Sequence, residues 1–466
     1  MELFDYQEKA VSAALAAIET RPVIVIPPGG GKTVIALGLI RALPDIKVDI
    51  MTHREEIRGQ FCTLFAQNGV PFGINQETRD RVQVCSVDTA YSRRDSWRRN
   101  GLVIVDEAHH SCAPTWAAVV GDYRWVVGLT ATPRRTDGVG LGDIYKRIIL
   151  GPSFRSLIDR GRLVPAEIIA PDPPDYTGVG VESGDFNRRA VLSRVDRSEI
   201  TGCALDHYER HAGGTKAVVY CVTVAHARHV KKRFEEAGHP VGIVTGSQAE
   251  SKREEAIKNF RSGKIMILIS VDVVSEGFDL PDMVTAILLR PTMSEALFIQ
   301  QTARPLRASA GKTHAIIIDA VGNVWRHGFP WADREWTLEG RKITARDVGT
   351  QDEKIARCAE CLHVYEAFRV VCPFCGAGQD KKERIIKEVK GNLSAITDTE
   401  YHKMIAEIKA RQEERAQAEA AEAERKSQIK RLIRQCRTLS DFQTVARAVG
   451  YDQGWAWHRW KYRNRR

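Results

Sequence analysis

The chain has 466 residues, of which 43% are hydrophobic and 27% are charged, a balance typical of globular proteins with more than one domain. Nothing in it approaches the roughly 18 unbroken apolar residues that a membrane-spanning helix requires. The first residues, MELFDYQEKA, lack the basic and apolar blocks of a secretory signal peptide. These features exclude the membrane-spanning class, and they predict a cytoplasmic location.

The net charge of +10 is concentrated at one end of the chain. Residues 427–466 hold ten Lys and Arg and two Asp and Glu, a local charge of +8. The preceding 426 residues hold 59 basic and 57 acidic side chains, a charge of +2. A nearly neutral body with a basic tail indicates a polyanionic partner.

Residues 1–165 alternate short β-rich apolar runs with helix-like segments. The runs are 23–26, 48–51, 82–86, 102–105 and 125–129. The same alternation recurs over 200–330, with runs at 217–221, 241–244, 265–269, 284–289 and 315–319. Strands that alternate with helices favour parallel sheets covered by helices. The sequence therefore predicts an α/β protein with two tandem parallel-sheet domains.

The remaining segments are assigned by composition. Residues 166–199 include a stretch rich in Pro, Gly and Asp and are predicted to be a linker. A Trp-containing connector, 331–356, leads to a cysteine cluster within 357–380. Residues 381–426 carry acidic and basic side chains four apart, such as Glu407 and Arg411, which favours an exposed helical spacer. Residues 427–466 form a basic, aromatic module.

The segment VIVIPPGGGKTVIALGLI, residues 23–40, has the pattern of a strand, a glycine-rich turn and a helix. Glycines let backbone amides surround phosphate oxygens at the N-terminus of the following helix. Lys32 would reach the β- and γ-phosphates of a nucleotide, and Thr33 would ligate Mg²⁺. Ile26 stands at the first glycine position of the common G-x-x-x-x-G-K-T pattern, so the match is incomplete. The residues expected at the phosphates are Pro28, Gly29, Gly30, Gly31 and Lys32.

A second apolar run, LVIVDEAHH at 102–110, ends in two carboxylates. A magnesium–nucleotide site needs one carboxylate near the metal and a base that orients the attacking water. Asp106 is expected to serve the metal and Glu107 to be the base. His109 and His110 could instead be metal ligands, although no second ligand cluster lies near them in the sequence.

Together with GLTATP at 128–133, these segments resemble the DEAH-box branch of the superfamily 2 helicases. The resemblance spans residues 5–307 and implies two RecA-like domains that bind ATP and Mg²⁺ between them. DYQ at 5–7 is similar to the adenine-reading motif of that family, which implies that Gln7 contacts the base. His109, Thr130 and Thr132 match positions that couple hydrolysis to the grip on nucleic acid.

Three further segments match motifs of the same family. THREEIRGQ at 52–60 and SVDTA at 86–90 resemble the segments that hold the nucleic-acid backbone, and ISVDVVSEGFDLP at 269–281 resembles the motif that joins nucleotide to nucleic acid. Val271 stands where many members have a phosphate-binding threonine. The resemblance implies nucleic-acid contacts by Arg54, Asp88, Thr89 and Ser270, and nucleotide contacts by Gly277 and Asp279.

QQTARPLR at 300–307 resembles the closing motif, in which Gln300, Arg304 and Arg307 face the γ-phosphate. A cation in that place is worth roughly 10³ to 10⁵ in rate, and a second domain that supplies it makes hydrolysis depend on closure of the cleft. Ala303 replaces the glycine usual before the first arginine, and Pro305 replaces the small residue usual after it. Because proline disfavours helical geometry at the residue before it, a helix is predicted to end near Arg304.

Residues 358–376, CAECLHVYEAFRVVCPFCG, contain two C-x-x-C pairs separated by ten residues. Four thiolates satisfy one tetrahedral zinc and leave no open position, so a structural role is favoured. A redox role for either pair is the competing interpretation, although no thioredoxin-like pattern surrounds them. The other six cysteines are single and predict core residues in a reduced compartment. The expected zinc ligands are Cys358, Cys361, Cys372 and Cys375.

The last residues, GYDQGWAWHRWKYRNRR at 450–466, interleave aromatic and basic side chains. Base stacking combined with phosphate neutralisation is typical of sequence-tolerant binders of single strands. The alternative is that the aromatics form a small core and leave only the charges exposed, and each is expected in part. The predicted nucleic-acid contacts are Trp457, Arg459, Trp460 and Lys461.

The motor, the cysteine cluster and the tail together look most like the bacterial RadD type and its phage-borne relatives. That resemblance implies a bacterial or phage-infected cell, a nucleoid-associated location, and single-stranded or branched DNA as partner. It also implies contact with single-strand-binding protein or a recombinase. The predicted function is an ATP-dependent DNA helicase or translocase in repair, recombination or replication. A recombination accessory factor with weak ATPase and no unwinding, and an RNA helicase, stay open as alternatives.

Overall fold

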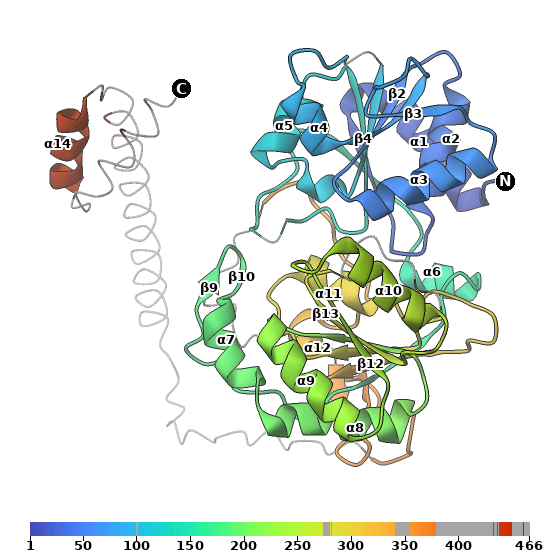
Figure 1. The fold of residues 1–466 in the computed structure, drawn as a ribbon, viewed down its shortest axis with the longest axis vertical. Helices are drawn as coiled ribbons and strands as arrows, with labels where there is room; N and C mark the ends of the chain where they lie inside the picture. The colour runs from blue at the N-terminus through green and yellow to red at the C-terminus, as the bar shows by residue number, and fades with distance from the viewer. Residues whose placement is uncertain are drawn as a thin grey trace, which may run out of the picture. The chain divides into compact units, whose positions relative to one another are not determined.

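The computed structural model describes residues 1–98, 101–135, 137–273, 280, 282–340, 355–378, 432, 436, 438–449 and 460. The chain divides into two compact units, Met1–Lys381 and Lys382–Arg466. Figure 1 labels helices and strands of the first unit, from α1 near the N-terminus to α12. Within the described residues, no helix is both long and apolar enough to cross a bilayer.

The first domain is built on a seven-stranded parallel sheet in the order β3-β4-β2-β5-β6-β1-β7. Its strands are β1 (Pro22–Val25), β2 (Val48–Thr52), β3 (Phe72–Ile74), β4 (Val82–Ser86), β5 (Leu102–Asp106), β6 (Trp125–Thr130) and β7 (Arg147–Leu150). Its helices are α1 (Asp5–Ala16), η1 (Ile18–Thr20), α2 (Lys32–Ala42), α3 (Glu55–Gln67), α4 (Val87–Ser92), η2 (Ala108–His110) and α5 (Pro114–Val120), and α6 (Phe154–Asp159) follows β7. Ile24 packs with α1–α3 and the adjacent Val23 with α4 and α5, because successive strand residues point to opposite faces.

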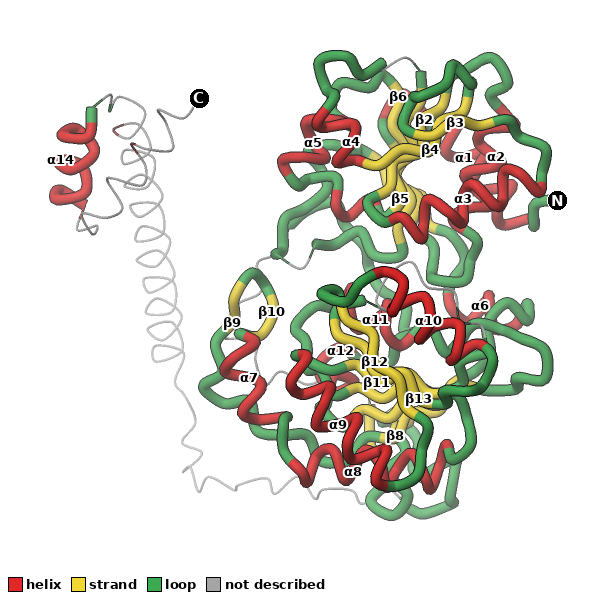
Figure 2. The backbone as a smooth tube through the Cα atoms, viewed as in Figure 1, coloured by secondary structure: helices red, strands yellow, loops and turns green. Residues whose placement is uncertain are grey.

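The second domain is built on a six-stranded parallel sheet in the order β12-β13-β11-β14-β15-β8. Its strands are β8 (Ala166–Ile169), β11 (Ala217–Tyr220), β12 (Val241–Thr245), β13 (Ile267–Val271), β14 (Thr285–Leu288) and β15 (Ala315–Asp319). Its helices are α8 (Ser198–Ala212), α9 (Val224–Glu236), α10 (Glu250–Arg261), α11 (Glu295–Thr302) and α12 (Asn323–His327). Figure 2 shows helices on both sides of the yellow strands, so the predicted class, α/β with two tandem parallel-sheet domains, is confirmed.

Residues 166–199 differ from the predicted linker. They contain β8, an antiparallel hairpin of β9 (Val181–Glu182) and β10 (Asp185–Phe186), and α7 (Arg188–Val195). β8 is the edge strand of the second sheet and pairs with β15, about 150 residues later in the chain. A four-residue run beside a proline-rich stretch gives no periodicity of its own, and only the long-range pairing makes it a strand. The second domain therefore begins earlier in the chain than the strand pattern, which starts near residue 200, predicts.

The cysteine cluster belongs to a small antiparallel ribbon, β16 (Ile355–Arg357) and β17 (Val364–Glu366). The ribbon lies against β8: the Ala170 amide donates to the Leu362 carbonyl at 3.2 Å, and Ile169 bridges His363. Arg357 forms an ion pair of 2.6 Å with Asp172. The ribbon thus covers a sheet edge that would otherwise present unpaired backbone groups.

The second unit is described chiefly by α14 (Leu439–Val449). Thr438 and Asp441 form reciprocal backbone-to-side-chain hydrogen bonds of 2.7 and 3.2 Å, the pattern of a helix N-terminal capping box. Phe442 and Ala446 are buried, and Trp460 packs against this cluster. One of the four predicted tail contacts therefore lies against a small core, whereas Trp457, Arg459 and Lys461 lie outside the described residues.

Candidate nucleotide and nucleic-acid site

The glycine-rich loop runs from the end of β1 to the first residue of α2. Gly29 and Gly31 have φ angles of +89° and +84°, which side-chain-bearing residues rarely adopt. A Cβ at Gly31 would overlap the side-chain amide of Gln7, and one at Gly29 would lie 2.7 Å from Leu163 Cδ2. The left-handed backbone geometry therefore favours glycine at these two positions. Pro28 and Thr33 lie beside them, half-buried.

Gln7 ties the first helix to this loop. Its Oε1 accepts a hydrogen bond of 3.0 Å from the Phe4 amide, and its Nε2 donates to the Gly30 carbonyl at 3.2 Å. The side chain is buried. The guanidinium of Arg162 lies 3.6 Å from the centre of the Phe4 ring, so an aromatic ring and a cation flank the segment before Gln7.

Lys32 and the two carboxylates meet at the adjacent ends of α2 and β5. The ammonium of Lys32 contacts Glu107 Oε1 and lies 4.0 Å from Asp106 Oδ1. Burial raises the pKa of Asp106 to about 6, and the Lys32 ammonium opposes that rise. Glu107 adopts a left-handed φ of +50°, an uncommon conformation for a residue with a side chain. The sequence predicted these three residues together, and the fold places them together.

A chain of polar contacts leads from Glu107 to the end of β6. His109 Nδ1 lies 3.4 Å from Glu107 Oε2 and 3.3 Å from Thr130 Oγ1. Thr130 Oγ1 donates to the Thr132 carbonyl at 2.9 Å and accepts from the Thr132 amide at 3.1 Å. All three partners of this relay, His109, Thr130 and Thr132, are buried. His109 therefore links the 130–133 loop to Glu107, the predicted base.

The arginine-bearing segment follows α11, which ends at Thr302 with Ala303 as its C-cap. This confirms that the helix stops before Pro305. Arg304 is buried. Arg307 forms an isolated backbone β-bridge with Leu163. Next to it, the Val164 amide donates to the Leu306 carbonyl at 2.8 Å. A Cβ at Gly29 would lie 3.9 Å from Arg307 Cγ. Arg307, from the second domain, thus lies beside Gly29 of the phosphate loop.

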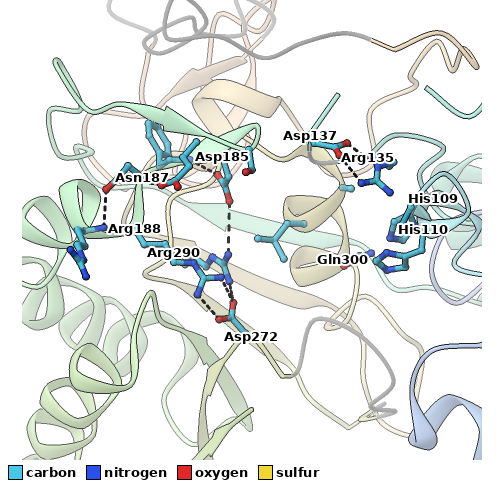
Figure 3. Close-up of a pocket in the computed structure, with 17 residues that line it drawn as sticks. His109, His110, Arg135, Asp137, Asp185, Asn187, Arg188, Asp272, Arg290 and Gln300 are labelled. Carbon is cyan, nitrogen blue, oxygen red and sulfur yellow. Dashed lines mark hydrogen bonds and ion pairs between the residues drawn. The ribbon is translucent and has the colours of Figure 1, made fainter. Parts of the chain in front are cut away.

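A cavity of about 1020 Å³ lies next to this site. His109 and His110 line it from the first domain, and Gln300 and the β9–β10 hairpin line it from the second (Figure 3). Asp272 contacts Arg290 and pairs with Arg188 at 2.8 Å on the wall formed by the second domain. The hairpin was not predicted from sequence, because its two-residue strands carry no recognisable period.

The predicted nucleic-acid residues divide between the two domains. Arg54 is the N-cap of α3 and Asp88 is exposed in the first turn of α4, next to the half-buried Thr89. These residues follow β2 and β4, which pair in parallel, so they lie at the same edge of the first sheet. Ser270 is buried near the end of β13 in the second sheet. Gly277 and Asp279 lie outside the described residues.

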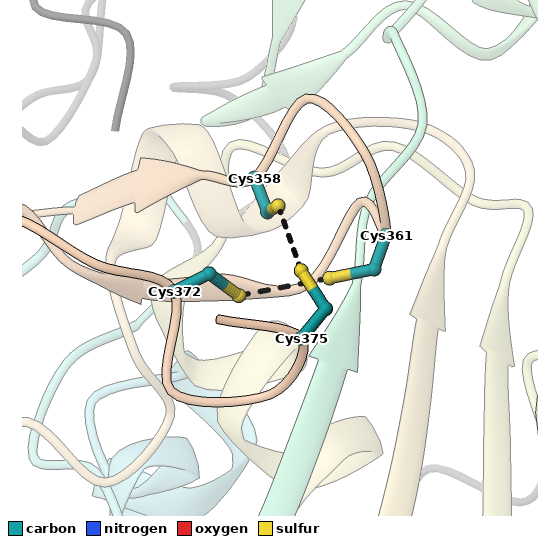
Figure 4. A group of neighbouring side chains, drawn as sticks. All are labelled: Cys358, Cys361, Cys372 and Cys375. Atoms are coloured by element: carbon teal, nitrogen blue, oxygen red, sulfur yellow. Dashed lines mark hydrogen bonds between the residues drawn. The ribbon is translucent and has the colours of Figure 1, made fainter. Parts of the chain in front are cut away.

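The four ribbon cysteines converge on one point, and Figure 4 shows their sulfurs directed toward one another. All four Sγ atoms lie within 4.8 Å of one another, with Cys358–Cys375 at 3.5 Å and Cys361–Cys372 at 3.6 Å. A tetrahedral zinc with bonds of about 2.3 Å separates its sulfurs by about 3.8 Å. The donor set and its spacing fit zinc.

Comparison with known proteins identifies families related to helicases. Residues 1–135 match the family described as "Type III restriction enzyme, res subunit", and residues 200–309 match "Helicase conserved C-terminal domain". The chain is 32% identical to a 51.5 kDa protein of Lactococcus phage 7-9, over 79% of this chain and 81% of the phage protein. It is 28% identical to the putative ATP-dependent helicase IRC3 of Saccharomyces cerevisiae, over 69% of this chain and 51% of the yeast protein. A DNA 3'-5' translocase, XPB2 of Sulfurisphaera tokodaii, is 25% identical over 69% of this chain and 82% of that protein.

Solved structures share the fold. A fragment of a putative HsdR subunit of a type I restriction enzyme from Vibrio vulnificus aligns with a TM-score of 0.56 at 20% identity, over 70% of this chain and 65% of that one. The type ISP restriction-modification enzyme LlaBIII bound to DNA aligns with a TM-score of 0.53 at 15% identity, over 69% of this chain and 28% of that one. Fold, site and relatives together define an ATP-dependent nucleic-acid motor. The chain belongs to the superfamily 2 helicases.

Proposed function

We propose that this protein is an ATP-dependent DNA helicase or translocase of the DEAH-box branch, most like the RadD type, that remodels DNA in repair, recombination or replication. One observation carries the proposal. Lys32, Asp106 and Glu107 meet in the first domain, while Arg307 of the second domain lies beside Gly29 of the same phosphate loop. A nucleotide between them would link the two domains.

In the proposed reaction, loop amides and Lys32 would hold the β- and γ-phosphates, and Thr33 and Asp106 would hold Mg²⁺, which would supply charge neutralisation. Glu107 accepts a proton from the attacking water, and Gln300 positions that water. Arg304 and Arg307 neutralise charge on the γ-phosphate. Lys32 contacts Glu107. If the Lys32 ammonium moved to a nucleotide phosphate, the Glu107 carboxylate would be released to accept the proton of the attacking water.

DNA is the proposed polymer because a relative is named a DNA translocase and a structural neighbour was solved with DNA. The charge of +8 over residues 427–466 supports a polyanionic partner. Zinc in the ribbon is proposed to be structural, since four thiolates leave no position for substrate. Single-strand-binding protein or a recombinase are proposed partners on the resemblance alone.

The decisive experiment measures ATP turnover with single-stranded DNA, double-stranded DNA or RNA added at equal nucleotide concentration. The wild type is expected to respond most to DNA. Lys32→Ala and Glu107→Gln are expected to remove the stimulated turnover, by about 10³-fold or more, and to leave DNA binding largely intact. Lys231→Ala, at an exposed ion pair on α9, is the matched control and should behave as the wild type.

Two results would redirect the proposal. Greatest stimulation by RNA would favour the RNA helicase. Weak turnover, with recombination activity retained in Lys32→Ala, would favour the accessory factor. Wild-type turnover in Glu107→Gln would remove that residue from the role of base.

A further inference from the structure

Glu295, the first residue of α11, is held by two arginines from different parts of the chain. Its Oε2 accepts from Arg134 Nη1 at 3.0 Å, and its Oε1 accepts from Arg334 Nε at 2.7 Å. Arg134 follows the 130–133 loop of the first domain, whereas Arg334 lies beyond the last strand of the second. Charge-assisted hydrogen bonds to both oxygens fix the carboxylate more strongly than one exposed ion pair would.

Residues 329–340, here called the strap, contain Arg334 and lead from the second domain to the first. The guanidinium of Arg334 donates to the backbone carbonyls of His327, Phe329, Pro330 and Ala332, which gives this segment a fixed course. Further along, the Leu338 carbonyl accepts from the Gly142 amide at 3.0 Å, and the Leu338 side chain packs against the core of the first domain.

Arg134 contacts the strap on one side. Its guanidinium lies 5.4 Å from the centre of the Trp336 ring, and its Nη2 donates to the Glu335 carbonyl at 3.4 Å. The Arg134–Glu295 pair is thus part of a contact between the two domains, with the strap packed beside it. The sequence offered one signal, the basic pair that directly follows TATP at 134–135, but no feature that named its partner 161 residues away.

α11 connects the Arg134–Glu295 contact to the nucleotide site as one continuous helix. The helix has eight residues, and those from Ala296 to Thr302 are buried except Leu297. Seven helical steps place its far end about 10 Å from Glu295. Gln300 lies near that end, and Arg304 follows the last helical residue, Thr302, by two positions. A shift of Glu295 relative to the first domain therefore displaces the arginine segment as well.

We propose that the Arg134–Glu295 pair positions the catalytic arginines: it sets the place of α11 against the first domain, and with it the distance from Arg304 and Arg307 to the phosphate loop. This inference rests on the proposed role of those arginines at the γ-phosphate. Arg134 and Glu295 are positioning residues, since neither lies among the groups expected to touch ATP. The pair also connects Arg134, directly after the 130–133 loop, to the helix that precedes the arginine segment.

The test is a double-mutant cycle in the full chain with Arg134→Gln, Glu295→Gln and the combined variant, assayed for nucleic-acid-stimulated ATP turnover. Each single variant is expected to lower kcat about tenfold, because misplacement by a fraction of an ångström weakens transition-state contacts. KM for ATP should stay within about twofold, since ground-state contacts are retained. The combined variant should lose no more than either single one. Arg134→Lys should recover part of the loss.

The design separates positioning from helix stability. Glu295 also favours the helix N-terminus electrostatically, whereas Arg134 does not belong to the helix. Slow turnover in Glu295→Gln with normal turnover in Arg134→Gln would therefore overturn the proposal, as would additive losses in the combined variant. Arg369→Gln, which breaks an ion pair of 2.6 Å within the ribbon, is the matched control and should keep wild-type kcat.

Lys32→Ala in the same assay distinguishes failure of the positioning role from failure of the proposed function. If Lys32→Ala is inactive and the Arg134 and Glu295 variants are normal, the positioning role fails and the proposed function stands. If Lys32→Ala keeps its turnover, the proposed function fails and this inference fails with it.

Discussion

Single residues in the first sheet show how burial sets protonation. Asp49 on β2 accepts hydrogen bonds from the Tyr123 hydroxyl at 2.5 Å and from Gln76 Nε2 at 2.9 Å. Burial raises the pKa of Asp49 from 3.8 to about 6, although these two donors oppose the rise. Asp106 has the same pKa direction for the same dominant cause. One carboxyl lies in the predicted nucleotide site and the other does not, so a raised pKa by itself does not identify function here.

The Asp49 shift predicts a pH dependence of stability. Between pH 3.8 and about 6 the folded protein keeps a proton that the unfolded chain releases, so the free energy of unfolding falls as pH rises through this window. Asp49→Asn removes that dependence and should be more stable than the wild type above pH 6, by on the order of 3 kcal/mol.

Urea unfolding of both proteins from pH 4.5 to 7.5 measures this difference. Asp95→Asn, at a fully exposed side chain, is the control and should follow the wild type at every pH. A constant difference between Asp49→Asn and the wild type across the range would show that Asp49 titrates normally.

At the scale of elements, the ribbon connects metal chemistry to the stability of the second sheet. β17 lies against β8, and β8 is held from its other side by β15 alone. His363 contributes to this junction, with its Nε2 3.2 Å from Glu167 Oε2 and its ring stacked on Phe374. If the ribbon holds the proposed zinc, loss of that ion should unfold the ribbon and uncover an edge strand, because so short a hairpin has little core of its own.

Cys372→Ser is therefore expected to lose bound zinc and to lower the thermal midpoint, while ATP turnover at low temperature persists. The measurement is zinc content by atomic absorption, with about one equivalent per chain in the wild type and none in the variant. Cys203→Ser, at a single half-buried cysteine on α8, is the control. Full zinc content in a Cys358→Ser/Cys372→Ser variant would contradict the assignment.

At the scale of the whole molecule, charge and motor are carried by separate units. The nucleotide-site residues discussed above lie within Met1–Lys381, whereas the basic module lies within Lys382–Arg466. Removal of residues 427–466 should accordingly weaken DNA binding and leave DNA-independent ATP turnover unchanged. If three basic residues contact phosphates, the slope of log K against log salt should decrease by about 2 to 3. Fluorescence anisotropy with a single-stranded oligonucleotide at several salt concentrations gives the slope, and an unchanged slope would exclude the tail from DNA binding.

Sequence reasoning recovered both sheets because their strands are apolar on both faces and separated by turn signals. It missed the edge strands β3, β7 and β8 and the β9–β10 hairpin, which are too short to show a period. β7 and β8 also depend on partners distant in the chain. The Arg134–Glu295 pair was missed for the same reason, since charged residues 161 positions apart give no local sign of pairing.

By itself, the sequence determined the chemistry of the parts: a glycine loop with a lysine, a strand that ends in two acids, an arginine segment broken by proline, and four cysteines at metal-ligand spacing. These are local patterns, and local backbone preference and residue type are sufficient to specify them. Only the tertiary structure decided how the parts meet. It brought Arg307 close to Gly29 through Leu163, laid the ribbon on β8, and joined the two domains at Glu295. Such contacts arise from the packing of segments far apart in the chain, which no spacing along the sequence encodes.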